Sequence, residues 1–108
     1  KVVDNPAIDV VLPVAGDFGS ISLTEEIIGA VESTTQEMWP GVVVLPTMTT
    51  GATDGAKMRN AGIPTYGVSG LFIDRNDVRA HGSDERLLVK SFYEGYEFMY
   101  RLIRKLSS

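Results

Sequence analysis

The chain has 108 residues, a formal net charge of −4, no cysteine and 44% hydrophobic residues. This composition predicts a soluble globular domain or part of one, and it excludes disulfide bonds, thiolate catalysis and cysteine-ligated zinc. Because 14 acidic residues outnumber 10 basic ones, we expect neither nucleic acid nor an anionic membrane as the main partner.

We expect no signal peptide in this sequence, because no basic region followed by an apolar one opens it, and no apolar run approaches the roughly 18 residues of a membrane span. The sequence opens at Lys1 rather than at a methionine. We therefore expect that this chain is cut from a longer protein.

The first part of the chain predicts a strand and then a helix. Residues 9–14 are a β-branched apolar run, which is typical of a strand. Ser22 and Glu25 have the spacing of a capping box, and Pro40-Gly41 predicts the end of the helix that starts there. The apolar residues expected on its buried face are Leu23, Ile27, Ala30, Val31 and Met38.

The middle of the chain predicts two more strands around a short helix. Residues 42–45 are continuously apolar and β-branched, as in a strand that is covered on both faces. The hydroxyl-rich and glycine-rich segment 47–55 leads into a short helix that ends at residues 61–62, and residues 65–69 predict another short strand.

The last part predicts a long polar loop over residues 71–86 and then a helix. Loops of this length in small domains are usually functional or disordered. The helix has a regular apolar stripe and an i,i+4 ion pair between Glu97 and Arg101. The stripe that we expect to be buried comprises Phe92, Tyr96, Met99, Ile103 and Leu106. Alternating strands and helices predict an α/β fold with a partly parallel sheet.

The turn formed by Gly51, Ala52, Thr53 and Asp54 is the first candidate site. It follows a predicted buried strand and precedes a helix, a position where free backbone N–H groups favour an anion or another ligand. The alternative is a plain turn in which Thr53 or Asp54 caps the helix. The segment lacks the spacing of a phosphate-binding Walker loop.

His81 is the second candidate and the only histidine. A neutral imidazole is a good zinc ligand, but a zinc site needs three or four protein ligands, so the alternative is an ordinary loop residue. A triad of Ser69, His81 and Asp74 can also be written, but the sequence around Ser69 lacks the spacing of a nucleophile elbow.

Five short motifs carry a family resemblance that runs from about residue 22 to 106. The first runs from Trp39-Pro40-Gly41-Val42 through Leu45-Pro46-Thr47-Met48. The other four are Gly51-Ala52-Thr53-Asp54, Ala61-Gly62-Ile63-Pro64-Thr65-Tyr66-Gly67-Val68, His81-Gly82-Ser83-Asp84-Glu85 and Phe92-Tyr93-Glu94-Gly95. In this order they resemble the C-terminal part of the dizinc aminoacylase and glutamate-carboxypeptidase family, which includes acetylornithine deacetylase and succinyl-diaminopimelate desuccinylase. Ser83 stands where the family usually has proline.

The resemblance implies a domain organisation. Residues 17–108 would be the C-terminal part of a zinc-peptidase catalytic domain, with a mostly parallel sheet flanked by helices. Residues 1–16 would be the closing strand of a lid and dimerisation domain with its hinge. His81 would be the last zinc ligand, Glu85 an acidic residue supporting that ligand, and the 51–54 turn part of the substrate cleft.

The resemblance also implies a chemistry. Two zinc ions in the full-length site would polarise an amide carbonyl and activate a bridging water, with a glutamate moving the proton. The substrate would be a small peptide or an N-acyl amino acid. The partners would be the rest of the catalytic domain and, in the full-length protein, a second copy. The other ligands and the general base would lie upstream, so we expect the chain alone to be inactive. The alternatives are a non-catalytic α/β binding module and an interaction fragment that needs a partner to cover its strands.

Overall fold

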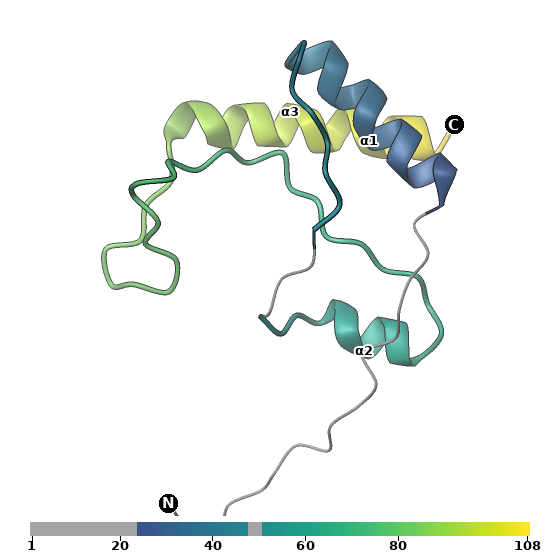
Figure 1. Ribbon diagram of the computed structural model, residues 1–108, viewed down its shortest axis with the longest axis horizontal. Helices are drawn as coiled ribbons and strands as arrows, with labels where there is room; N and C mark the ends of the chain where they lie inside the picture. Colours follow the sequence, from purple (N-terminus) through teal and green to yellow (C-terminus); the bar gives the residue numbers. More distant parts are fainter. Residues whose placement is uncertain (1–23, 48–50) are drawn as a thin grey trace, which may run out of the picture.

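The computed structural model describes residues 24–47 and 51–108. These residues form helix α1 (Glu25–Met38), helix α2 (Gly55–Asn60) and helix α3 (Val89–Leu106). Helices α1 and α3 pack against each other, whereas α2 stands apart from both (Figure 1). No helix in the described part of the chain could cross a membrane.

Helix α1 begins and ends close to the predicted residues. Glu25 and Glu26 occupy its first turn, where acidic side chains suit the positive end of the helix dipole. At its other end Gln36 accepts the Gly41 N–H at 3.1 Å and donates to the Val42 carbonyl at 2.7 Å. The Ser22 half of the predicted capping box lies outside the described residues, as do the strand at 9–14 and the hinge.

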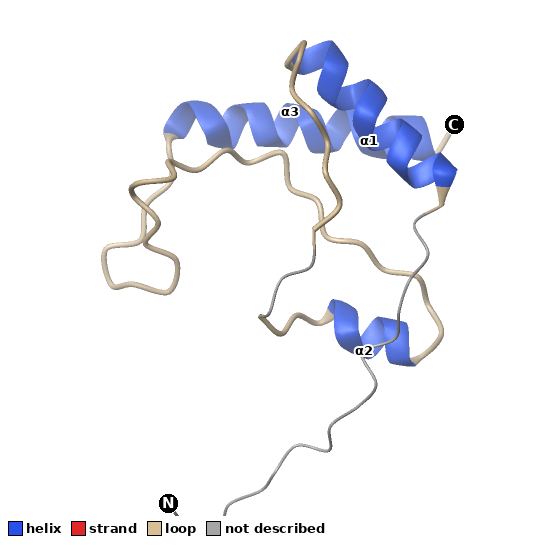
Figure 2. Cartoon of the chain, viewed as in Figure 1, coloured by secondary structure: helices blue, strands red, loops and turns tan. Residues whose placement is uncertain are grey.

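The predicted parallel sheet is wrong for the residues that the structure describes, which are helices and loops without a strand (Figure 2). Along residues 42–45 exposure alternates as in a strand, with Val43 73% and Leu45 72% exposed. A strand also requires a neighbouring backbone to accept and donate its hydrogen bonds. Neither 42–45 nor 65–69 has such a neighbour among the described segments, so both remain loop.

The small core lies between α1, α3 and the start of the long loop. Phe98 and Leu102 of α3 are its buried apolar side chains among the described residues, at 2% and 3% exposure. The Trp39 ring stacks on Phe98 with 5.5 Å between centroids and meets the edge of Phe72 at 4.8 Å. These three aromatic rings join the end of α1, the middle of α3 and the start of the loop.

Small residues on α3 let the loop backbone approach it closely. The Ser91 hydroxyl accepts the Phe72 N–H and donates to the Phe72 carbonyl, both at 2.7 Å. Gly70 has φ +62°, and a Cβ there would lie 2.6 Å from the Phe98 ring. A Cβ on Gly95 would lie 2.4 Å from Leu71. The loop therefore sits in a groove made by the absence of side-chain bulk.

This groove corrects the predicted buried face of α3. The helix buries Ser91, Gly95, Phe98 and Leu102, one position away from the predicted apolar stripe. Phe92, Tyr96 and Ile103 are 56%, 69% and 58% exposed. The i,i+4 pair is confirmed, with Arg101 Nε 2.6 Å from Glu97 Oε1.

Substituting Gly70 tests the groove. We expect Gly70→Ala to lower the free energy of unfolding by about 2–4 kcal/mol, because the left-handed backbone disfavours a Cβ and the Phe98 ring leaves no room for it. The measurement is the urea midpoint followed by far-ultraviolet circular dichroism. The matched control is Gly62→Ala, at φ +81° with no atom within 4 Å of its Cβ, which should lose only about 1–2 kcal/mol. Equal losses would show that the groove contributes nothing.

Candidate functional site

His81 lies at the tip of the long loop, in a tight turn. The Gly82 N–H donates to the Arg79 carbonyl at 3.0 Å, and the Glu85 N–H donates to the Gly82 carbonyl at 3.2 Å. His81 is the third residue of the first turn and has φ +64°, a value usually reserved for glycine or asparagine at that position. Its side chain is exposed. The loop therefore presents the imidazole outward from a sharply bent backbone.

An ion-pair network ties the two arms of this loop together. Arg79 Nε lies 2.5 Å from Asp77 Oδ1, and Arg86 Nη2 lies 2.6 Å from Asp77 Oδ2. Arg79 also pairs with Asp84. We call Asp77, Arg79, Asp84 and Arg86 the loop network. Asp77 is its centre, because each of its carboxylate oxygens binds a different arginine.

The loop network changes the acidity of Asp77. Hydrogen bonds from Arg79, which has the largest effect, and from Arg86 hold the pKa of the Asp77 carboxyl below its ordinary value of 3.8. Both arginines favour the charged carboxylate, and they outweigh the smaller opposing effect of burial. Asp77 therefore stays ionised at any pH near neutrality.

A cavity of about 500 Å³ lies inside the loop. Its apolar wall is formed by Leu71, Ile73, Val78, Leu87 and Leu88. Asp77, Arg79 and Arg86 also line it, but their charged groups are engaged with one another. His81 is not among the residues that line the cavity, so the imidazole lies outside it.

Glu85 reaches the His81 turn through its backbone N–H, and its side chain is exposed. The four residues of the 51–54 turn are exposed as well, and the turn lies apart from the long loop (Figure 1). Asp54 is the N-cap residue of α2 without a side-chain capping bond. Its carboxylate is fully exposed and lies 4.0 Å from Lys57 Nζ.

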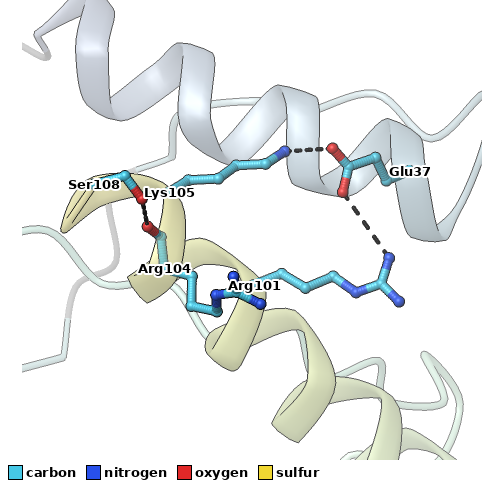
Figure 3. Close-up of a pocket in the computed structure, with 5 residues that line it drawn as sticks. All are labelled: Glu37, Arg101, Arg104, Lys105 and Ser108. Carbon is cyan, nitrogen blue, oxygen red and sulfur yellow. Dashed lines mark hydrogen bonds and ion pairs between the residues drawn. The ribbon is translucent and has the colours of Figure 1, made fainter.

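A second hollow, of about 250 Å³, lies between α1 and α3 (Figure 3). Lys105 Nζ lies 2.5 Å from Glu37 Oε1, and Arg101 Nη1 lies 3.9 Å from Glu37 Oε2. Lys105 also donates to Ser33 of α1. These ion pairs join the two helices. We therefore interpret them as contacts that hold α1 against α3, and the hollow as the space between them.

The donors in the described part of the chain do not form a complete metal site. Among the described residues no three histidine, aspartate or glutamate side chains converge where they could hold an ion. His81 fits a single position of a zinc coordination shell, which needs three or four protein ligands.

Comparison with known proteins gives the chain a family. Residues 11–105 match peptidase family M20/M25/M40. The chain belongs to this family. It is similar to the probable carboxypeptidase S-like 2 of Dictyostelium discoideum, with 31% identity over 84 residues. The aligned region covers 77% of this chain but only 16% of that protein. No solved structure matches the chain.

Family membership confirms the resemblance carried by the five motifs and places the chain among peptidases, which are hydrolases. Peptidases of this family generally use zinc. The domain boundaries and the roles of His81, Glu85 and the 51–54 turn stay predictions.

The loop network is the part of the site that sequence reasoning missed. Its members were visible only as a dense run of charged residues, and Asp77 and Arg86 are nine positions apart. Opposite charges at such spacings indicate pairing only once the turn at residues 79–82 brings the arms together. The signal was the combination of that charge run with Gly82.

The pH dependence of the loop follows from Asp77. Because its pKa in the folded chain lies below the unfolded value, the pairing stabilises the loop above about pH 3.8 and is lost as the pH falls through the folded-state pKa. We expect the Asp77 carboxyl ¹³C shift to titrate below 3.8 in the folded chain and near 3.8 in urea. In Arg86→Gln the folded midpoint should rise. Equal midpoints in the folded and urea-unfolded chain would contradict the network.

Proposed function

We propose that this chain is a section of the catalytic domain of a zinc-dependent peptidase or amidohydrolase that cleaves a peptide or an N-acyl amino-acid amide bond. Its membership of the M20/M25/M40 peptidases supports this function. The observation that carries the proposal is the exposed imidazole of His81, held at the tip of a braced loop in a chain of that family.

In this proposal His81 supplies one ligand to one zinc ion, and residues outside the chain supply the rest. An exposed imidazole can reach an ion that is held largely by another segment. The aligned region covers only 16% of the Dictyostelium relative, which is consistent with further ligands in the rest of such a protein.

The low burial in the structure supports the same proposal. The radius of gyration is 18.3 Å, against about 13 Å for a compact domain of about 100 residues. Large apolar side chains on α3 are exposed, including Phe92, Tyr96 and Ile103. Exposed apolar area on this scale is typical of a surface that packs against further structure.

The ligand role of His81 is tested in a protein that carries the complete site. We expect His81→Ala to lose at least one zinc ion per polypeptide, measured by elemental analysis, and to lose activity by more than the roughly 10–100-fold typical of changes around a ligand. Ser83→Ala, an exposed change in the adjoining turn, is the matched control and should keep both.

Two outcomes would contradict the proposal. A His81→Ala protein with normal zinc and activity would remove the ligand role. Two tightly bound zinc ions on the 108-residue chain alone would show that it needs no outside ligands.

The 51–54 turn is tested separately, through substrate binding. If the turn lines the cleft, Thr53→Ala should raise KM about 10-fold while zinc content stays unchanged, because a lost hydrogen bond to substrate weakens binding by about that factor. Thr47→Ala, an exposed threonine before the turn, is the control. Unchanged kinetics in Thr53→Ala would leave the turn as the start of α2 and nothing more.

A further inference from the structure

The backbone of His81 is held in a left-handed conformation that is unfavourable for a residue with a Cβ. Among the described residues it is the one non-glycine residue with a positive φ. A side chain with a Cβ disfavours this region by roughly 5–30-fold relative to the ordinary helical region. Such a residue persists only where its surroundings fix it, and these conformations cluster at functional sites.

The loop network surrounds His81 on both sides. Asp77 and Arg79 precede it in the chain, and Asp84 and Arg86 follow it. Arg79 pairs forward with Asp84, and Asp77 pairs forward with Arg86. Both pairs therefore cross the bend at residue 81.

A change of φ at His81 would break both crossing pairs. Rotation there redirects all of the chain that follows, so Asp84 and Arg86 would swing away from Arg79 and Asp77. Each exposed ion pair contributes up to about fivefold to a local equilibrium. Together with the two turn hydrogen bonds, the pairs can offset the preference against the left-handed conformation.

We propose that Asp77 is a positioning residue, which acts through Arg79 and Arg86 to hold His81 in its left-handed turn with the imidazole presented outward. Asp77 does not contact the imidazole and is not a ligand. The holding of the turn stands on the geometry of this chain. Its use, the placement of a metal-binding imidazole, rests on the proposed function.

The test is nuclear magnetic resonance on the 108-residue chain, comparing wild type with Asp77→Asn. A positive φ brings the His81 amide and α protons close together and gives a strong cross-relaxation signal between them. We expect this signal to fall to that of an ordinary residue in Asp77→Asn. Exchange of the Gly82 and Glu85 amide protons, which close the two turns, should accelerate about fivefold or more.

Asp74→Asn is the matched control. It removes one negative charge from the same loop, but Asp74 caps the Asn76 N–H at 2.8 Å and is not a member of the loop network. Asparagine can keep that cap. The His81 signal should therefore persist, with amide exchange changed less than about twofold.

Rescue separates positioning from a general loss of stability. Asp77→Glu keeps the two carboxylate oxygens and should restore much of the His81 signal, whereas Arg86→Gln should weaken it. Helix α3 amide protons report whether the fold is intact. The proposal is overturned if Asp77→Asn leaves the His81 signal unchanged, or if it melts α3 together with the loop.

The two proposals fail in different experiments. The positioning role is refuted if the His81 conformation is unchanged in Asp77→Asn, measured with no metal in the sample. Loss of the ligand role appears as normal zinc content in His81→Ala, whatever Asp77 does. In a protein with the complete site, Asp77→Asn should lower zinc affinity about 10–100-fold while Asp74→Asn does not.

Discussion

The double hydrogen bond between the Ser91 hydroxyl and the backbone of Phe72 is the constraint on which the rest of the structure depends. It satisfies a donor and an acceptor of the loop at 2.7 Å each, and it links residues 19 positions apart. Only a small side chain at position 91 allows the loop backbone so close to α3. Phe72 is thereby placed against Trp39, which stacks on Phe98, so this single contact joins α1, α3 and the loop.

The same contact turns residues 73–88 into a loop that is closed at both ends by one helix. Phe72 is fixed at its start and Val89 begins α3 at its end. Closing the ends restricts the loop before any internal pair forms, which lowers the entropy cost of the pairs inside it. The partly exposed loop network can then order the tip although each of its pairs is individually weak.

The sequence predicted the positions of the helices well. It was wrong about the strands at 42–45 and 65–69 and about the face of α3 that is buried. The ends of α1, α2 and α3 are set by local signals such as Pro40, Gly62 and the basic residues of the last turn of α3. Strands depend on a second backbone, and the apolar run at 42–45 contains no information on whether one is present. The buried face of α3 failed for a related reason, because Ser91 and Gly95 are buried through their small size rather than their hydrophobicity. His81 was predicted as a ligand from its residue type and family motif, and that role stays a prediction. The network that braces His81 depends on a fold of the loop that no local pattern shows.

The conformation of His81 bears on how a braced loop could serve a metal site assembled from separate segments. A ligand that is already bent into place loses little conformational freedom when it binds, so the cost of ordering falls on folding rather than on metal binding. Here the brace is made by residues of the loop itself, since Asp77, Arg79, Asp84 and Arg86 all lie within it. The loop therefore holds the bend at His81 with its own residues, whether or not an ion is bound. A loop of this kind can deliver one imidazole to an ion held elsewhere, and the strain at residue 81 is met by salt-sensitive pairs whose strength the ionic environment can change.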